Sequence, residues 1–415
     1  MAMSTGGLAW LRTAPAEART ALWAAGLGWM LDAFDVMLYA LVLPAVMQDL
    51  GLTKATAGLI GSATLVAGAV GGVLFGRIAD RYGRTRALMG SILLYSVFTA
   101  AAGFAQTAVH LALFRIGLGL GMGGEWASGA ALVAETWPDE HRGKALGLMQ
   151  SAWAVGYALA AIVATFVLPI WGWRAVFLVG VVPALLTVWI RRAVPEPQVW
   201  QTTVRSGART RFADVFADGR AGLTVALALM NACCLFAWWG FNSWIPAFLS
   251  LSVAQGGVGL SPTAMGWLVV WMQVGMWIGY VTFGAIADAF GRKRVYVTYL
   301  LMASLLMLVY AQTRTPMVLV LLGPLVALFG TGYFTGFGVV TSESYPTAVR
   351  ATAQGLTYNI GRLASAGAPF VVGSLADIHG FSAAFSVVGL AFLAAAGWWV
   401  FIPETRGRTI TPSAA

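Results

Sequence analysis

Two aspartates, Asp32 and Asp35, stand three residues apart inside a long and otherwise apolar run. On a helix this spacing places both carboxyl groups near one face. Two carboxyl groups that share an apolar site cannot both ionise cheaply, so one of them is suited to bind and release a proton. We expect at least one of them to be a proton-coupling site, with Asp35 slightly preferred. The alternative is that one of them only neutralises Arg115, in another apolar run.

Arg362 lies in the middle of a further apolar run, flanked by the small residues Gly361 and Ala364. An unpaired buried charge is far more costly than a paired one, so a guanidinium at this place requires an anion. We predict that it binds the carboxylate of a small ligand through two parallel hydrogen bonds. The alternative is a permanent ion pair with Glu125 or with one of the two aspartates.

Arg115 and Glu125 belong to one glycine-rich segment, in which every second residue from Gly117 to Gly123 is glycine. Ten residues of helix separate the two side chains by about 15 Å, so they cannot pair directly. The glycines allow another helix to approach closely. For Arg115, a part in proton coupling and a purely structural part both stay open. Glu125 is either a second proton carrier or a partner for Arg362.

Uncharged polar and aromatic residues within the apolar runs are candidates to complete a ligand site. For each one alone, packing or a hydrogen bond between helices is the simpler interpretation. A second set of tryptophans, Trp239, Trp244, Trp267 and Trp277, is expected to anchor helices at the membrane–water interface. The candidate ligand-binding residues besides Arg362 are Gln150, Trp153, Tyr157, Asn231, Trp238, Asn242, Tyr333 and Asn359.

The composition predicts that lipid surrounds the elements that carry these residues. Of the 415 residues 59% are hydrophobic and only 10% are charged, and the mean hydropathy is +0.78. A soluble domain has about 25% charged residues, so this chain has too little polar surface to cover a water-soluble particle. The sequence therefore predicts a multi-pass protein of the cell inner membrane, in contact with lipids.

The net charge of +9 does not indicate a nucleic-acid partner, because the basic residues are distributed by side. In the expected topology 20 of the 25 Lys and Arg residues fall on one side of the membrane. This asymmetry predicts that the basic side, with both termini, is cytoplasmic. The two adjacent cysteines, Cys233 and Cys234, lie in an apolar run and are expected to be buried.

Apolar runs of about 20 residues recur between short polar or Gly/Pro segments and predict twelve spanning helices. We expect two six-helix bundles, residues 1–192 and 222–415, joined by a cytoplasmic loop over 193–221. The expected spans are 22–46, 57–76, 87–104, 110–133, 145–168, 174–192, 222–249, 263–283, 295–311, 317–340, 353–374 and 382–401.

The two halves repeat each other at an offset of 208 residues. Gly76-Arg-Ile-Ala-Asp-Arg-Tyr-Gly-Arg-Thr-Arg recurs from Gly284 as Gly-Ala-Ile-Ala-Asp-Ala-Phe-Gly-Arg-Lys-Arg. Glu135-Thr-Trp-Pro recurs from Glu343 as Glu-Ser-Tyr-Pro at the same offset. Agreement of separate motifs on one register indicates a duplicated six-helix unit.

The segment from Gly76 to Arg86 closely resembles the signature loop of the major facilitator superfamily. The second copy resembles its weaker counterpart, with Ala289 where the family often has a basic residue. The resemblance covers nearly the whole chain. It implies an all-α integral membrane fold of two pseudo-symmetric six-helix bundles, a midplane site and transport of a small solute by alternating access.

Finer motifs resemble the sialate:proton and aromatic-acid:proton symporters. They are Asp32-Ala-Phe-Asp, Gly121-Met-Gly-Gly-Glu-Trp and Trp171-Gly-Trp-Arg. Tyr358-Asn-Ile-Gly-Arg resembles the eleventh helix of organic-anion and nicotinate-type carriers. The resemblance implies proton-coupled uptake of an organic acid anion, with Arg115 supporting proton transfer. The serious alternative is an exporter of drugs or metabolites that exchanges them for protons.

The resemblance also implies a cytoplasmic gate of charged motifs that latches this side shut in the outward-facing state. Capping of helix ends is a simpler interpretation that does not exclude the latch. The residues concerned are Gly76, Asp80, Arg81, Gly83, Arg84, Glu135, Arg142, Asp288, Arg292, Glu343 and Arg350.

An enzyme is not expected, because His110, His141 and His379 are scattered in or beside loops without a nucleophile–base spacing. A receptor built on the same fold would respond to a ligand without moving it. We expect no cofactor and no metal, protons as the coupling ion and a monomer.

Overall fold

The computed structural model describes residues 9–194, 215–217 and 219–406, apart from the side chains of eleven residues, among them Asp80. Only helices, turns and loops occur in these ranges. The helices of the first half are α1 (Ala9–Thr13), α2 (Ala16–Leu50), α3 (Lys54–Tyr82), α4 (Arg84–Ala102), α5 (Ala108–Thr136), α6 (Asp139–Val179) and α7 (Ala184–Ala193). Those of the second half are α9 (Ala221–Ser250), η2 (Val253–Gln255), α10 (Pro262–Phe290), α11 (Arg292–Gln312), α12 (Pro316–Thr331), α13 (Phe334–Ser344), α14 (Thr347–Ser365) and α15 (Ala368–Trp398).

Two of these helices each join two membrane spans. Among the described residues, nine stretches are long and apolar enough to cross a membrane, and two of them have 50 and 47 residues. A helix of 50 residues would be about 75 Å long, more than twice the apolar thickness of a bilayer. Each stretch contains one glycine with positive φ, Gly172 (φ 73°) or Gly380 (φ 79°), where one helix ends and another begins. With both divided and α5 included, the expected twelve spans are present.

Breaks inside three spans were not expected from the sequence. Turns separate α6 from α7, α12 from α13, and α14 from α15. The first break precedes Pro183, and the third precedes Pro369, which cannot donate a backbone hydrogen bond to the previous turn. The second lies at Gly332 and Tyr333. Such breaks let one span present different faces at its two ends.

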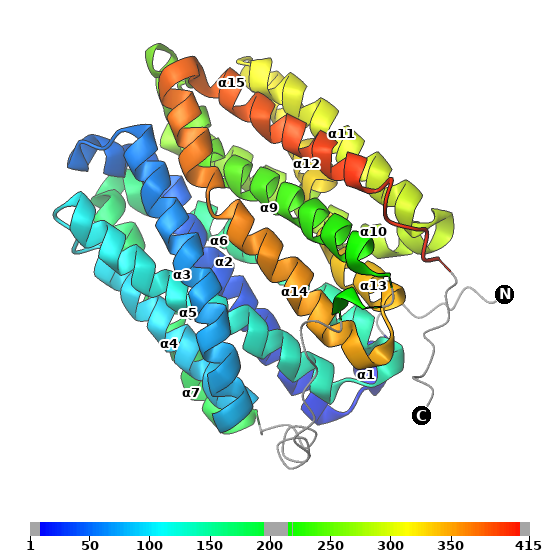
Figure 1. Ribbon diagram of the computed structural model, residues 1–415. Helices are drawn as coiled ribbons and strands as arrows, with labels where there is room; N and C mark the ends of the chain where they lie inside the picture. The colour runs from blue at the N-terminus through cyan, green and yellow to red at the C-terminus, as the bar shows by residue number, and fades with distance from the viewer. Residues whose placement is uncertain (1–8, 195–214, 218, 407–415) are drawn as a thin grey trace.

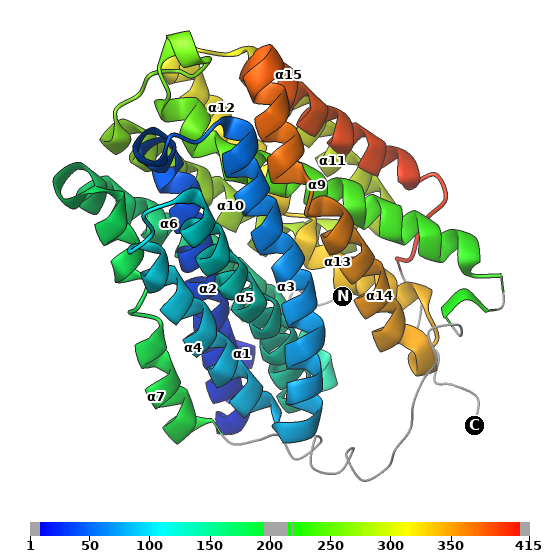
Figure 2. The same cartoon turned by 60° about the vertical axis from the view of Figure 1, so that its left-hand side comes forward.

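The spans form two bundles that lie side by side, α2–α7 in one and α9–α15 in the other (Figure 1). Within the first bundle α2 packs on α5 and α6, and α3 packs on α5. Within the second, α9 packs on α14 and α15, and α10 packs on α12. The bundles meet where α6 contacts α10, where α3 contacts α15 and where α2 contacts α9 (Figure 2).

Glycine makes the close contact between α3 and α5 possible. A side chain at Gly119 or Gly123 of α5 would collide with the backbone of α3 at Thr64 or Gly68. The expectation that this glycine-rich segment admits a neighbouring helix is therefore confirmed. The close approach brings Arg115 and Glu125 of α5 against the helices that face the other bundle.

We call the end of the bundles that holds Gly83 and Gly291 the basic end, and the other the opposite end. At the opposite end the bundles are joined by hydrogen bonds from Lys54 N (3.3 Å) and Ala55 N (2.7 Å) of α3 to the Asp377 carboxylate of α15. Lys54 Nζ also lies 3.5 Å from that carboxylate. Further along the same contact, Phe370 N donates to Ser62 Oγ at 3.2 Å. The two bundles are therefore closed against each other at the opposite end.

Candidate functional site

Five ionisable side chains from α2, α5 and α14 are buried in the middle of the molecule. Asp32, Asp35 and Glu125 are completely buried, and Arg115 and Arg362 are 2% and 6% exposed. No other Asp, Glu, Lys or Arg within the described part of the chain is buried to this degree. The residues that the sequence singled out by their position in apolar runs thus form one buried group around the contact between the bundles.

Arg362 reaches from the second bundle to the first. Its guanidinium lies against Gly68 of α3, where a Cβ atom would be 3.2 Å from Nη2. It interacts electrostatically with Asp32. Yet no carboxylate of the described residues lies within 4.0 Å of it. The permanent ion pair that we considered as the alternative is therefore not formed.

The two aspartates of α2 also lack direct partners. None of their four carboxylate oxygens has a hydrogen-bond partner. Asp35 lies beside Thr99, but the Thr99 hydroxyl donates to Tyr95 O at 2.8 Å instead. Asp32 and Asp35 interact electrostatically with each other and with Arg115, beyond ion-pair distance. A carboxyl group buried without a hydrogen bond or a paired cation is most stable in its neutral, protonated form.

Glu125 is ten residues from Arg115 along α5, and Asp32 interacts electrostatically with both of them. Glu125 packs against the backbone of Gly28 of α2. Neither of its carboxylate oxygens has a hydrogen-bond partner. Its charged neighbour is Asp32 rather than Arg362. The arrangement therefore adds a third carboxyl group to the buried cluster, one that is not used to neutralise Arg362.

A cavity, which we call the central cavity, lies beside Arg362 between the two bundles. Four tryptophans pack in a chain along it. The ring centroids of Trp29 and Trp153 are 4.6 Å apart, those of Trp153 and Trp238 5.5 Å, and those of Trp238 and Trp239 4.8 Å. The indole N–H groups of the first three have no acceptor. The full lining is Trp29, Met122, Gln150, Trp153, Leu235, Trp238, Trp239, Tyr280, Phe334, Tyr358 and Arg362.

The structure brings only some of the predicted polar residues to this cavity. Gln150, Trp153 and Trp238 line it together with Arg362. Asn231 lines an adjoining cavity that shares Gln150 with the central one. Asn242 lines a third cavity, inside the second bundle.

The three remaining residues do not face the central cavity. The buried hydroxyl of Tyr157 donates to Asn242 O at 3.4 Å, and that of Tyr333 donates to Cys234 O at 3.4 Å. Asn359 is exposed and donates to Gly355 O of its own helix at 2.8 Å. Packing and hydrogen bonding within or between helices, the simpler interpretation, describes these three residues, and the Tyr157 hydrogen bond joins α6 of the first bundle to α9 of the second.

The sequence analysis did not identify several aromatic residues of the site. It also expected two buried tryptophans at the membrane interface. The expectation that Trp239 and Trp244 anchor at the membrane interface is wrong, because they are 7% and 0% exposed. Both lie on α9, whose face toward the first bundle is covered by α2. Trp267 and Trp277 are half-exposed, at 51% and 44%, as an interface position requires.

Helical spacing in the sequence could have identified two of the aromatic residues that the sequence analysis did not name. Trp29 precedes Asp32 by three positions, and Tyr358 precedes Arg362 by four, so each shares a helix face with a candidate charge. Nothing comparable marked Tyr280, which belongs to a helix without a candidate charge near it.

The charged motifs at the basic end pair in the same way in both halves. Arg84 donates to Glu135 at 3.0 and 3.1 Å, and Arg292 donates to Glu343 at 3.1 and 3.3 Å. Each pair joins residues 51 positions apart within one bundle. Asp288 also pairs with Arg292. Gly83 and Gly291, with φ of 113° and 102°, directly precede the two arginines and form the turns from α3 to α4 and from α10 to α11.

The remaining gate candidates take individual places at this end. The Arg81 guanidinium lies 5.3 Å from the centroid of the Tyr82 ring, and Arg142 donates to Trp137 O at 3.4 Å. Gly76 lies on α3 with open space beside it, and Arg350 lies on α14. The Asp80 side chain lies outside what the structure describes. The pairs described here fix each half by itself, and the latch between the halves stays a prediction.

Comparisons with known proteins agree with this architecture. The model of the Major Facilitator Superfamily matches residues 25–258 and 248–415. The probable 4-methylmuconolactone transporter of Cupriavidus pinatubonensis is 35% identical over 415 residues, which cover 97% of this chain and 94% of that protein. The sialic acid transporter of Escherichia coli is 31% identical over 394 residues, 93% of this chain and 94% of that one.

Among solved structures, the xylose transporter of E. coli in a partially occluded inward-open conformation shares the fold. Its TM-score is 0.77 at 19% identity, over 95% of this chain and all of that one. At this low sequence identity, the likeness to the solved structure shows only that the fold is shared. The family model and the two relatives match nearly the whole sequence, and they show the family. The chain therefore belongs to the major facilitator superfamily, and its relatives are transporters of organic acids and other metabolites.

Proposed function

We propose that this protein takes up a small organic acid anion together with protons by alternating access. The observation that carries the proposal is the state of Arg362. This side chain is buried, borders the central cavity and has no carboxylate of the described chain within ion-pair distance. A carboxylate in the cavity would supply the missing anion and could accept two hydrogen bonds from the guanidinium.

The tryptophans support an acid with a flat, apolar body. Indole faces and edges line the cavity next to the cation, and three of their N–H groups lack acceptors. An unsaturated or aromatic acid would pack on these rings, and its further oxygen atoms would accept from the N–H groups. The relative named for 4-methylmuconolactone, an unsaturated acid, agrees with this class of substrate, whereas the relative named for sialic acid agrees only in the carboxylate.

The buried charges support a coupling rule. The described chain buries three carboxyl groups (Asp32, Asp35 and Glu125) and two guanidinium groups (Arg115 and Arg362). Such a group of charges costs least to bury when its net charge is zero. Without substrate, neutrality requires one of the carboxyl groups to hold a proton, and a bound monoanion requires a second proton. We therefore expect one proton to travel with each negative charge of the substrate.

This rule also removes the electrical cost of transport. Each uncompensated charge that crosses the membrane gains or loses about 2.3 kcal/mol per 100 mV. An anion alone would enter against a negative-inside potential, whereas an anion with its proton crosses without net charge.

The positive-inside rule assigns the basic end to the cytoplasm and the opposite end to the outside. The contacts of Asp377 with α3 then close the outer end, and the structure corresponds to a carrier closed to the outside. Substrate would enter after these contacts separate and would leave toward the basic end.

The test is proton movement in liposomes that contain the purified protein and an internal pH dye. Benzoate, cis,cis-muconate and sialic acid are added outside, with a neutral sugar and a cationic dye as controls. Saturable acidification driven by one acid class, abolished in Arg362→Ala and kept in Lys144→Ala, supports the proposal. Lys144 is an exposed cation at the basic end and serves as the matched control. If no acid acts and the cationic dye drives protons the other way, the protein is an exchanger that exports, and the proposal fails.

A further inference from the structure

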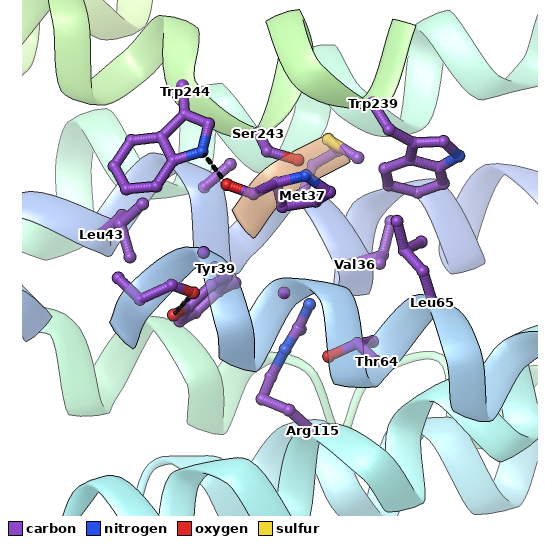
Figure 3. Close-up of a pocket in the computed structure, with 15 residues that line it drawn as sticks. Val36, Met37, Tyr39, Leu43, Thr64, Leu65, Arg115, Trp239, Ser243 and Trp244 are labelled. Atoms are coloured by element: carbon purple, nitrogen blue, oxygen red, sulfur yellow. Dashed lines mark hydrogen bonds between the residues drawn. The ribbon is translucent and has the colours of Figure 1, made fainter. Parts of the chain in front are cut away.

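A second cavity, which we call the Arg115 cavity, lies between the bundles on the side toward the opposite end. Residues of α2, α3 and α5 form one side of it, and residues of α9 with Pro369 of α15 form the other (Figure 3). Trp239 borders both this cavity and the central cavity. The two cavities are therefore neighbours along the contact between the bundles.

Arg115 extends from α5 into this cavity, between Tyr39 and Thr64 (Figure 3). It is 2% exposed, and its Nε and Nη1 atoms have no hydrogen-bond partner. Its closest described partner is the ring of Tyr39, with the guanidinium carbon 4.7 Å from the ring centroid. The Tyr39 hydroxyl is used elsewhere, because it donates to Ala57 O at 2.9 Å. A buried cation with unfilled donors is costly unless an anion occupies the space beside it.

The charged groups that face Arg115 do not fill these donors. Asp32 and Asp35 interact with it electrostatically, but neither lies within ion-pair distance. The Thr64 hydroxyl donates to Ile60 O at 2.9 Å and is thereby oriented to its own helix. An anion in the cavity would be the direct partner that the chain itself does not provide.

The rest of the lining favours an anion with an apolar body. Val36, Met37 and Leu65 lie on the side of the first bundle, and Trp239 and Trp244 lie on the side of α9. The Trp244 N–H donates to Pro369 O at 2.8 Å, which fixes the ring as a wall. Ser243 adds one hydroxyl on the same side. A small carboxylate with an unsaturated or aromatic ring matches this combination of one cation and apolar walls.

The cavity also lies at the contact that must separate for the opposite end to open. Gly58 and Gly61 of α3 line it, and both pack directly on Pro369 of α15. Separation of α3 from α15 would therefore open the Arg115 cavity first and the central cavity behind Trp239 next.

We propose that the Arg115 cavity is a second anion-binding site, which receives the carboxylate of the substrate from the opposite end before it reaches Arg362. In this inference, the identity of the bound anion as the substrate rests on the proposed function. The binding of an anion at Arg115 can be tested without it.

The first experiment measures the charge preference of the cavity with two thiol reagents of similar size. Ser243→Cys is made in the full chain with Cys233→Ala and Cys234→Ala, reconstituted with its opposite end accessible. Sulfonatoethyl methanethiosulfonate is the anionic reagent, and trimethylammonioethyl methanethiosulfonate is the cationic one. We expect the anionic reagent to label position 243 about tenfold faster or more. Arg115→Gln should abolish this preference and Arg115→Lys should keep it.

Position 250 provides the matched control. Ser250 is the last residue of α9 and does not line the cavity, so Arg115→Gln should leave the labelling ratio of Ser250→Cys unchanged. A ratio at position 243 that Arg115→Gln does not change would overturn the inference. Absence of labelling at 243 by both reagents would also overturn it, because the cavity would then not open to that side.

The second experiment separates this inference from the proposed function. In liposomes that transport benzoate, Arg115→Gln should raise the half-saturating concentration at the opposite end about tenfold and leave that at the basic end unchanged. Intact acid-driven uptake without the charge preference would refute the second site alone. A charge preference without any acid-driven proton movement would refute the proposed function alone.

Discussion

The Asp377 carboxylate of α15 caps the first turn of α3 in the other bundle. It accepts hydrogen bonds from Ala55 N at 2.7 Å and from Lys54 N at 3.3 Å, and it pairs with Lys54 Nζ at 3.5 Å. A carboxylate at a helix N-terminus interacts favourably with the free N–H groups and with the helix dipole. Because donor and acceptor belong to different bundles, this cap stabilises the closed opposite end rather than the helix alone.

Asp377→Ala should therefore shift the protein toward the state that is open at the opposite end. We expect a loss of about 1 kcal/mol from the closed state, which changes the ratio of the two states about fivefold. The measurement is the rate at which Ser243→Cys is labelled from the opposite end, which should rise in the Asp377→Ala background.

The control for this prediction is Asp49→Ala at the same end of the molecule. Asp49 of α2 accepts from Arg174 Nη1 at 2.8 Å within one bundle, so its loss breaks an ion pair without separating the bundles. A rise of similar size in both variants would show that the Asp377 cap does not hold the bundles together.

Asp35→Asn and Asp32→Asn should separate substrate movement from proton movement. An amide at either position cannot release a proton, and it removes one carboxyl group from the three that balance the buried arginines. We expect at least one variant to exchange labelled substrate across the membrane while a pH gradient no longer drives uptake. If both variants remain fully driven by the gradient, neither aspartate carries the proton, and Glu125 becomes the remaining buried carboxyl group to test.

Replacement of Gly172 or Gly380 by alanine should destabilise the turn between two spans. Their φ values of 73° and 79° lie in the left-handed region, where a Cβ atom costs about 1–2 kcal/mol. The thermal unfolding temperature of the purified protein in detergent should fall in both variants. Gly284→Ala is the matched control, because Gly284 lies within α10 with open space around it and alanine is favoured there. Equal stability of the three variants would show that these two turns relax freely.

Glu404 should stabilise the basic end in a manner that depends on pH. Burial of its carboxyl raises the pKa, but hydrogen bonds from the backbone N–H groups of Arg406, Arg292, Lys293 and Thr405 lower it more, so the pKa lies below its usual value. A depressed pKa means that the folded state favours the charged form. The resulting stability is present above the ordinary Glu pKa of about 4.3 and is lost as the pH falls through the lower pKa of the folded state.

Glu404→Gln should consequently lower the unfolding temperature at pH 7, and the difference from the unmodified protein should shrink as the pH falls below about 4. The comparison at low pH serves as the internal control. A difference of the same size at both pH values would show that the charge of Glu404 does not contribute.

The 208-residue repeat in the sequence holds for backbone geometry outside the repeated motifs as well as within them. Gly83 and Gly291 take the same positive-φ conformation 208 residues apart, and so do Gly172 and Gly380. Only the first pair belongs to the repeated motifs. The shared register implies equal backbone geometry in both halves, because a duplicated chain with the same turn residues folds by the same local rules.

The sequence by itself also determined which charges are buried, since an ionisable residue in the middle of an apolar span has no route to water. It could not determine their pairing. Arg362 and Asp32 belong to different bundles, and whether they meet within 4.0 Å depends on how far apart and at what rotation the bundles pack. For the same reason the sequence assigned Trp239 to a helix but could not determine that its side chain faces a cavity.

Only the tertiary structure decided that the two arginines border separate neighbouring cavities and that the opposite end is the closed one. Local sequence sets the helices, their ends and the spacing of side chains along one face. The relation between two bundles is set by the few side chains that meet across them, such as Asp377 and Ala55, and these are more than 300 positions apart in the chain.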